Sequence, residues 1–332
     1  MNRRIAVVAF TQRGTELSHA IKAILTDDDV DIFDKTKQSA ADFVGENFNL
    51  RDAFIFIGAA GIAVRLVAKH IKKKDVDPAV IVIDELGDFV IPILSGHIGG
   101  GNELAEEISG MIKATPVITT ATDINKCFAV DVWATKLGCA IPETGEIKHI
   151  SSAVLNGQKI GLFSDGFDIE GEIPSCFDLA EKGIGVSVSL SGRSKHFEKE
   201  INIVPKIVTL GAGCRRGTPE DAFEAFILGF LEDNGICIAA VRTMASLDLK
   251  ANEECMLAFS KKYCIPFVTY TAEQLNEVEG EFSHSDFVFK TTGVDNICER
   301  SASAEGGKLI IRKTAENGMT AAAALQNWKC KF

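Results

Sequence analysis

Short apolar runs alternate with helical patterns through the first part of the chain. Nearly every residue is apolar in four runs, which is typical of buried strands: 4–10, 53–57, 79–83 and 89–94. Between these runs, apolar residues recur at the spacing of three or four that an amphipathic helix requires. The repeated strand-then-helix order predicts a mostly parallel sheet with helices on both faces.

Polar or glycine-rich junctions follow several of these strands. Gly58 and Gly61 come after one strand, and the pair Asp84 and Glu85 comes after the next. Open α/β sheets bind ligands at the carboxyl ends of their strands. We therefore expect the functional residues of this region to lie at these junctions.

The longest junction is a glycine-rich loop after 89–94. A helix that begins after such a turn is expected to have unpaired backbone N–H groups, which favour an anion or a developing oxyanion. His97 adds the side chain best suited to proton transfer near neutral pH. The spacing matches neither the G-x-G-x-x-G dinucleotide fingerprint nor a P-loop. The other candidate binding residues of the loop are Ser95, Gly96, Gly99, Gly100, Gly101 and Asn102.

The same strand-to-helix pattern returns after Pro205. An apolar run at 206–210 leads into the sequence GAGCRRGT, and Pro219 suits the first turn of a helix with Thr218 as its N-cap. Farther along, Asn317-Gly318 is a tight-turn signal that makes 319–325 a candidate hairpin partner of the strand at 308–312.

Between these two regions the sequence is rich in loops and shows no recognisable chemistry. A chain of 332 residues also exceeds one ordinary hydrophobic core. We therefore predict three domains: an N-terminal α/β domain at 1–124, a small middle module at 125–204 and a C-terminal α/β domain at 205–332. The expected fold class is α/β, with two Rossmann-like three-layer units joined by a small middle α/β module.

Composition narrows the class of protein. The chain is 46% hydrophobic and 24% charged, which describes a folded soluble protein, and its net charge of −11 argues against a nucleic-acid partner. No apolar run approaches the roughly 20 residues of a membrane span. Nine cysteines without C-x-x-C spacing indicate reduced thiols and a cytoplasmic location. The oligomeric state stays open, a homodimer included.

The motifs taken together resemble the cobalt-precorrin-5A hydrolase family of anaerobic cobalamin biosynthesis. The resemblance is carried by IGAAGIAVRLVAKHIKKKDVDPAVIVIDELGDFVIPILSGHIGGGNELAEEI, by GAGCRRGT and by TGVDNICERSA, and it covers 53–123 and 207–325 strongly. It implies that water opens the ring-A lactone of cobalt-precorrin-5A and that acetaldehyde leaves, giving cobalt-precorrin-5B. It also implies a large, flat substrate that carries cobalt and many carboxylates.

Lactone hydrolysis needs an activated water, stabilisation of an oxyanion and a proton for the leaving oxygen. His97 could act as base or acid, or it could simply hold the loop through backbone hydrogen bonds. Asp84 and Glu85 could orient His97 or take the proton; the alternative is a capped turn with solvated carboxylates. The amides of the glycine run and of Asn102 could form an oxyanion hole, although helix–strand packing and an N-cap explain the same residues.

Binding of substrate carboxylates needs cations. Arg215 and Arg216 could clamp carboxylates bidentately, and the alternative is a surface pair. Arg65 is a further anion-binding candidate, beside Gly58 and Gly61. Cys214 is better explained as a small buried residue than as a nucleophile. The remaining candidates in this loop are Gly211, Gly213, Gly217 and Thr218.

The histidines are scattered and no metal-ligand spacing is present, so we expect no metal site and no cofactor, with cobalt arriving inside the substrate. Two other functions stay open. A non-catalytic tetrapyrrole carrier would bind the macrocycle without forming product. A nucleotide- or phosphate-binding α/β enzyme would be stabilised by ATP or NAD.

Overall fold

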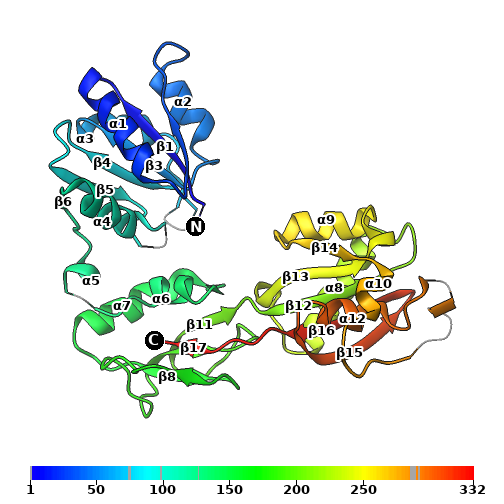
Figure 1. The fold of residues 1–332 in the computed structure, drawn as a ribbon. Coiled ribbons are helices and arrows are strands. Elements are labelled where there is room, and N and C mark those ends of the chain that lie inside the picture. Colours follow the sequence, from blue (N-terminus) through cyan, green and yellow to red (C-terminus); the bar gives the residue numbers. More distant parts are fainter. Residues whose placement is uncertain (1, 74–75, 98, 126, 285–288, 291) are drawn as a thin grey trace. The chain divides into compact units, whose positions relative to one another are not determined.

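The computed structural model describes residues 2–73, 76–97, 99–125, 127–284, 289–290 and 292–332. Its internal contacts divide the chain into two compact units, Met1–Val132 and Trp133–Phe332 (Figure 1). Both units combine helices with sheets, and the predicted α/β fold class is confirmed. Each unit is described by itself.

The first unit contains a six-stranded sheet in the order β2-β1-β3-β4-β5-β6. Neighbouring strands are parallel except for β4 and β5, which are antiparallel, with Val80 opposite Leu94 and Ile83 opposite Val90. The strands are β1 (Arg4–Ala9), β2 (Asp29–Ile32), β3 (Ala53–Ile57), β4 (Ala79–Ile83), β5 (Phe89–Leu94) and β6 (Thr115–Pro116).

The direction of β5 corrects one expectation. Because β5 runs opposite to β4, its carboxyl end lies beside the amino end of β4. The loop after Leu94 is therefore at one edge of the sheet, whereas the junctions after β3 and β4 are at the other edge. The predicted parallel arrangement would bring these junctions to a common edge, but the antiparallel β5 separates the loop that contains His97 from the other two.

Helices cover both faces of this sheet, as predicted. Ile5 and Val7 pack against α1 (Gln12–Ile24) and α4 (Gly101–Ile112), whereas the alternate residue Val8 packs on the other face against α2 (Ala40–Asn47) and α3 (Ala60–Val67). This alternation follows from the two-residue period of a strand. After β6 come α5 (Ala121–Ile124) and α6 (Val130–Lys136), and α6 crosses from the first unit into the second.

The second unit begins with a four-stranded sheet in the order β7-β11-β10-β8. Its strands are β7 (Cys139–Ala140), β8 (Gly161–Ser164), β10 (Ile184–Val188) and β11 (Lys199–Pro205), and η1 (Thr144–Glu146) leads into α7 (Ile147–Leu155). The end of the chain returns to this region, because β17 (Cys330–Lys331) pairs with β9 (Ile169–Glu170). The Trp133 ring also stacks on Phe332, with centroids 4.8 Å apart. The predicted boundaries after 124 and 204 stay predictions.

The second unit also contains a five-stranded sheet in the order β14-β13-β12-β16-β15. β12, β13 and β14 are parallel, and β16 is antiparallel to both of its neighbours. The predicted hairpin is confirmed, since Asn317 and Gly318 turn with φ of 49° and 82° between β15 and β16. The strands are β12 (Val208–Gly213), β13 (Val241–Leu247), β14 (Phe267–Tyr270), β15 (Lys308–Glu316) and β16 (Met319–Leu325).

Among the helices that the structure describes with their bounds, two lie on each face of this sheet. Leu210 and Ala212 point to α8 (Glu220–Asp233) and α9 (Glu254–Tyr263), and α10 (Ala272–Asn276) and α12 (Ile297–Ser303) lie on the opposite face. Two 3₁₀ turns, η2 (Ile238–Ala240) and η3 (Asp248–Lys250), flank β13. The predicted N-cap at Thr218 is wrong, because α8 starts at Glu220 and the Thr218 hydroxyl instead donates to the carbonyl of Arg215.

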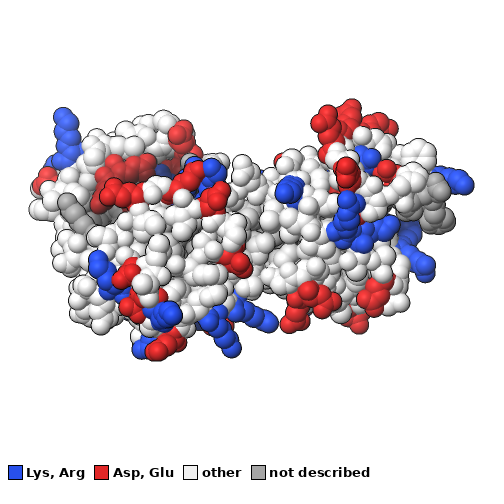
Figure 2. All heavy atoms as spheres, turned by 90° about the horizontal axis from the view of Figure 1, so that it is seen from below, with Lys and Arg blue, Asp and Glu red and all other residues white. Residues whose placement is uncertain are grey.

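None of the helices in the described part of the chain combines the length and the apolar character that a bilayer crossing needs. On the face shown in Figure 2, Lys and Arg side chains are interspersed with Asp and Glu, and broad areas carry no charge.

Candidate functional site

The β5–α4 loop folds back on itself through backbone hydrogen bonds. Gly100 N–H donates to the carbonyl of His97 (2.8 Å), Gly101 N–H to that of Ser95 (3.1 Å) and Asn102 N–H to that of Gly96 (2.9 Å). Three of the amides that we assigned to an oxyanion hole are therefore used within the loop. In this structure they are not available to a ligand.

The glycines of this loop are explained by close packing. A Cβ on Gly96 would lie 2.6 Å from Asn102 Oδ1, and a Cβ on Gly99 would lie 2.7 Å from the carbonyl oxygen of Ser95. Asn102 is the second residue of α4 rather than its N-cap, and its amide donates to Thr120 Oγ1 at 3.1 Å. The packing interpretation thus accounts for these residues without a ligand.

His97 faces a carboxylate that sequence reasoning missed. Its Nδ1 lies 3.7 Å from Oδ2 of Asp131, and the two side chains are 17% and 7% exposed. Burial alone would raise the pKa of Asp131, but the facing His97 and the Val132 N–H outweigh burial and hold that pKa below its ordinary value. An ionised carboxylate on one ring nitrogen fixes the orientation of an imidazole and stabilises its protonated form. The pair is suited to acid–base chemistry.

Asp84 and Glu85 do not belong to this pair. Val80, and not Asp84, lies opposite the end of β5, so the hypothesis that Asp84 orients His97 is wrong. The Asp84 carboxylate instead accepts from the N–H groups of Leu86 (3.0 Å) and Phe89 (2.6 Å), which is the capped turn of the alternative interpretation. Glu85 is exposed in the same turn.

Gly58, Gly61 and Arg65 lie at the β3–α3 junction. Gly58 N–H donates to the carbonyl of Ile83 (2.8 Å), and the exposed Arg65 donates to the carbonyl of Gly61 in its own helix (3.2 Å). These residues are at the sheet edge opposite His97. Their predicted role in anion binding stays a prediction.

A cavity of about 380 Å³ lies in the second unit and joins two motifs that are far apart in sequence. Gly213, Cys214 and Arg215 come from the GAGCRRGT motif, and Thr292, Asn296, Ile297 and Cys298 come from the TGVDNIC motif. Three cationic side chains line it: Arg215, Lys250 and Lys313. Apolar residues such as Leu247 and Met319 complete its walls.

The hairpin turn determines where Arg215 lies. Arg215 N–H donates to the carbonyl of Gly318 at 3.1 Å. A Cβ on Gly318 would lie 2.5 Å from the Arg215 Nε, so glycine at this position lets the guanidinium stem cross the turn. The Asn-Gly turn therefore both closes the hairpin and leaves room for the Arg215 side chain.

A buried carboxylate fixes the strand that carries Lys313. Glu299 is 0% exposed and accepts from the Lys313 N–H, the Ser283 N–H and the Ser283 hydroxyl, each at 2.8 Å. Burial would raise the pKa of Glu299, but these donors outweigh it and lower the pKa. Asn296 caps the same helix by accepting from the Glu299 N–H at 3.1 Å. Sequence analysis assigned no individual role to these residues. The TGVDNIC motif, which contains Asn296 and directly precedes Glu299, was the signal that could have found two of them.

The predicted clamp of paired guanidiniums is divided between two hollows. Arg215 lines the cavity, whereas Arg216 lines a second hollow of about 500 Å³ with Gly217 and Thr218. The Gly217 N–H donates to Glu253 Oε1 at 2.8 Å, so this amide is already used.

Gly211 has a packing role rather than a binding role. A Cβ on Gly211 would lie 1.8 Å from the carbonyl oxygen of Cys298, so the absence of a side chain lets α12 approach β12. Of the predicted binding residues in this loop besides the arginines, Gly213 and Cys214 line the cavity, whereas Gly211, Gly217 and Thr218 do not. Burial raises the pKa of the Cys214 thiol, which fits the interpretation of Cys214 as a non-nucleophilic residue.

Comparison with known proteins covers most of the chain. Three family models match in order: "Cobalamin synthesis G N-terminal" at 42–123, "Cobalamin biosynthesis central region" at 128–183 and "Cobalamin synthesis G C-terminus" at 208–324. The cobalt-precorrin-5A hydrolase of Salmonella typhimurium is 36% identical, with 82% of each chain covered. The cobalt-precorrin-5A hydrolase of Priestia megaterium is 30% identical, covering 96% of this chain and 94% of that one. A protein named CobE from a Sinorhizobium species is 32% identical over 35% of this chain and 79% of its own length.

Proposed function

The chain belongs to the cobalt-precorrin-5A hydrolase family, and we propose that it hydrolyses cobalt-precorrin-5A in anaerobic cobalamin biosynthesis. Water opens the ring-A lactone of this substrate, and a two-carbon unit leaves as acetaldehyde to give cobalt-precorrin-5B. Cobalt enters as part of the substrate, and the reaction itself draws only on the substrate and water.

The observation that carries this proposal is the cavity where the GAGCRRGT and TGVDNIC motifs meet. A chain with a net charge of −11 nevertheless places Arg215, Lys250 and Lys313 around one cavity, although Lys250 also pairs with Glu253 at 2.8 Å. Such a set of cations suits a ligand with several carboxylates, and a guanidinium can hold a carboxylate through two parallel hydrogen bonds. The cavity is smaller than a substituted macrocycle, so we assign to it one carboxylate-bearing edge of the substrate.

We assign the proton transfers to His97, with Asp131 as its positioning residue. Attack by water on the lactone carbonyl requires a base, and departure of the ring oxygen requires an acid. The imidazole can supply both in turn, because it takes a proton from the water and returns it to the leaving oxygen. The carboxylate of Asp131, at 3.7 Å, stabilises the imidazolium that exists between these steps.

The expectations from sequence about location, partners and oligomeric state are part of the same proposal. We retain a cytoplasmic location, a small-molecule rather than nucleic-acid partner, and a homodimer as one oligomeric state to be tested. Size-exclusion chromatography with light scattering measures the last of these directly.

The proposal is tested by incubating the reduced protein with cobalt-precorrin-5A under anaerobic conditions. We expect acetaldehyde in the solution and a corrinoid whose mass reflects gain of water and loss of acetaldehyde. Heat-inactivated protein is the control for spontaneous opening. A change in the corrinoid spectrum on mixing, without acetaldehyde or a mass change, would instead indicate a carrier. Stabilisation by ATP or NAD with no corrinoid binding would indicate a nucleotide-dependent enzyme.

A further inference from the structure

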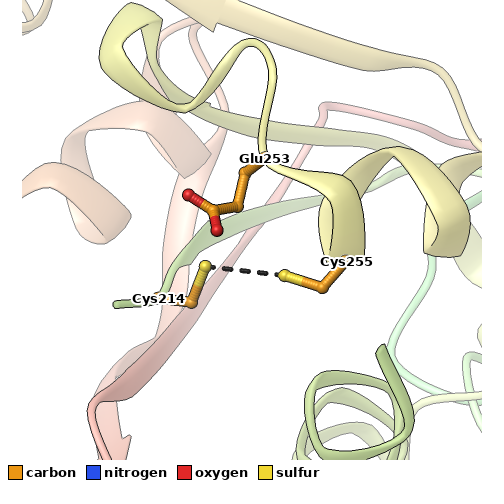
Figure 3. A group of neighbouring side chains, drawn as sticks. All are labelled: Cys214, Glu253 and Cys255. Carbon is orange, nitrogen blue, oxygen red and sulfur yellow. Dashed lines mark hydrogen bonds between the residues drawn. The ribbon is translucent and has the colours of Figure 1, made fainter. Parts of the chain in front are cut away.

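Three potential metal ligands meet beside the cavity, at the end of β12 and the start of α9. The sulfur atoms of Cys214 and Cys255 are 3.7 Å apart, and a carboxylate oxygen of Glu253 completes a group whose ligand atoms all lie within 4.8 Å of one another. Figure 3 shows the two sulfur atoms pointing toward each other, with the Glu253 carboxylate directed to the same side. Within the described part of the chain, this is the group of three such residues that lies close enough to hold one ion.

We propose that Cys214, Glu253 and Cys255 form a binding site for one Zn²⁺ ion, with a water as the fourth ligand. The site borders the cavity assigned to the substrate, because Cys214 and Lys250 also line that cavity, but metal binding is argued and tested without the substrate. It departs from the sequence-based expectation of no metal, because Cys214 and Cys255 come from different elements and have no recognisable ligand spacing.

The spacing of the two sulfur atoms fits zinc. Zn–S bonds of about 2.3 Å in a tetrahedral site place two sulfur ligands about 3.8 Å apart. The observed 3.7 Å is almost the same distance, whereas a disulfide bond of about 2.05 Å would require the two sulfur atoms to come closer by more than about 1.5 Å. Two sulfur ligands and one carboxylate also favour zinc over the hard cations magnesium and calcium.

The charges around the group balance for a divalent ion. Two thiolates and the Glu253 carboxylate carry three negative charges, and Lys250 lies 2.8 Å from Glu253 Oε2. One lysine and one Zn²⁺ ion supply three positive charges. The other oxygen of this carboxylate accepts from the Gly217 N–H at 2.8 Å.

The two thiols are shielded from solvent, since Cys255 is buried and Cys214 is partly buried. A bound cation is the partner that makes a buried thiolate favourable. Binding forms two Zn–S bonds and releases both thiol protons to the solvent. Because Cys214 also lines the cavity, water can reach the fourth coordination position.

The test uses the full chain, reduced and freed of metal by a chelator, with Co²⁺ alone as a spectroscopic substitute for zinc. We expect one Co²⁺ per chain to give a thiolate-to-cobalt charge-transfer band in the near ultraviolet and the visible bands of a tetrahedral site. One equivalent of Zn²⁺ should remove both. Zinc should also raise the temperature of thermal unfolding, because it binds the folded chain.

Variants distinguish this site from chance binding. Cys214→Ser or Cys255→Ser should abolish the charge-transfer band and lower zinc affinity by more than about 100-fold, since even partners outside the coordination shell typically contribute 10- to 100-fold. Cys264→Ser, at an exposed cysteine that ends the same helix, should leave both unchanged. Cys214 is only partly buried, so its serine variant tests the site even if Cys255→Ser fails to fold.

Three results would overturn the proposal. The first is the absence of a charge-transfer band in the reduced wild-type protein at stoichiometric Co²⁺. The second is a band of equal strength in Cys214→Ser. The third result concerns protein purified without reductant. If two of its thiols became titratable only after reduction, and if this change required both Cys214 and Cys255, the pair would form a disulfide.

Discussion

Two glycine-rich strand-to-helix junctions, the β5–α4 loop and the β12–α8 loop, differ in what their glycines make room for. In the β5–α4 loop, Gly96 and Gly99 let the chain fold back on itself, and the loop amides donate to loop carbonyls. In the β12–α8 loop, Gly211 lets a helix approach the sheet, and Arg215 turns toward a cavity. Both junctions are rich in glycine, so glycine content does not distinguish their functions. The side chains do: Arg215 suits binding of substrate carboxylates and His97 suits proton transfer.

The largest effect is expected at His97. His97→Asn keeps a polar side chain but cannot shuttle a proton near neutral pH, so turnover of cobalt-precorrin-5A should fall by about 100- to 10,000-fold. Binding of the substrate, followed by its absorption spectrum, should be retained. Asp131→Asn should lower turnover less, because it removes the positioning group and leaves the imidazole. A wild-type rate for His97→Asn from about pH 6 to 9 would make His97 a residue that only holds the loop.

The next effect contrasts one glycine from each junction. A Cβ at Gly211 would meet backbone atoms, the Cys298 carbonyl oxygen at 1.8 Å and the Ala302 nitrogen at 2.8 Å. Gly211→Ala should therefore lower the free energy of unfolding by about 3 kcal/mol or more. At Gly96 the Cβ would meet the Asn102 side chain, which can shift, so Gly96→Ala should cost less.

Thermal and denaturant unfolding of the purified variants measure this difference. Gly217→Ala is the matched control in the second junction, because its φ is 72° but its Cβ would have no neighbour within 4 Å. It should cost only about 1 kcal/mol, from backbone conformation alone. Equal losses at Gly96 and Gly211 would contradict the distinction between side-chain and backbone obstruction.

A smaller effect separates the two arginines. Arg215→Ala should weaken substrate binding by about 30- to 150-fold, which corresponds to roughly 2–3 kcal/mol for a charged hydrogen-bonded contact. Turnover at saturation should change much less. Arg216→Ala, in the second hollow, is the matched control and should weaken binding far less. Spectroscopic titration with the cobalt macrocycle measures both affinities. Equal losses of affinity would indicate that the two arginines act together as one clamp.

The sequence anticipated local structure better than tertiary direction. Asn317-Gly318 predicted its hairpin correctly because the turn chemistry is local. The prediction of a mostly parallel sheet does not hold for β5, since only 84–88 separate β4 from β5 and a parallel crossover needs a dozen residues or more. That short connection by itself requires β5 to run antiparallel to β4, which places Asp84 away from His97.

The two buried carboxylates could not be found in the same way. Asp131 reaches His97 from a helix that lies beyond β6, and Glu299 holds the backbone of a strand. Each is the one acidic residue of its own helix, and although the TGVDNIC motif marks the segment of Glu299, nothing in the local sequence pattern marks the partner of either carboxylate. Both depend on how separate elements pack, and a periodic pattern carries no information about that.

The smallest effect distinguishes these two carboxylates by their response to acid. Both have pKa values below the ordinary range, Asp131 because His97 and Val132 N–H outweigh burial and Glu299 because backbone N–H groups do. A carboxyl group with a lowered pKa stabilises the fold above its unfolded value of about 4, and that stabilisation is lost as the pH falls through the folded pKa. Hydrogen exchange below about pH 4, corrected for the intrinsic rate, should therefore show weaker protection both in α6 and in β15.

Variants assign each loss of protection to one carboxylate. His97→Asn removes the side chain that most lowers the pKa of Asp131, so the loss of protection of α6 in acid should shrink or change sign. The loss in β15 should stay as in the wild type. Glu299→Gln should do the reverse. If acid weakened both segments equally in all three proteins, neither carboxylate would be the group responsible.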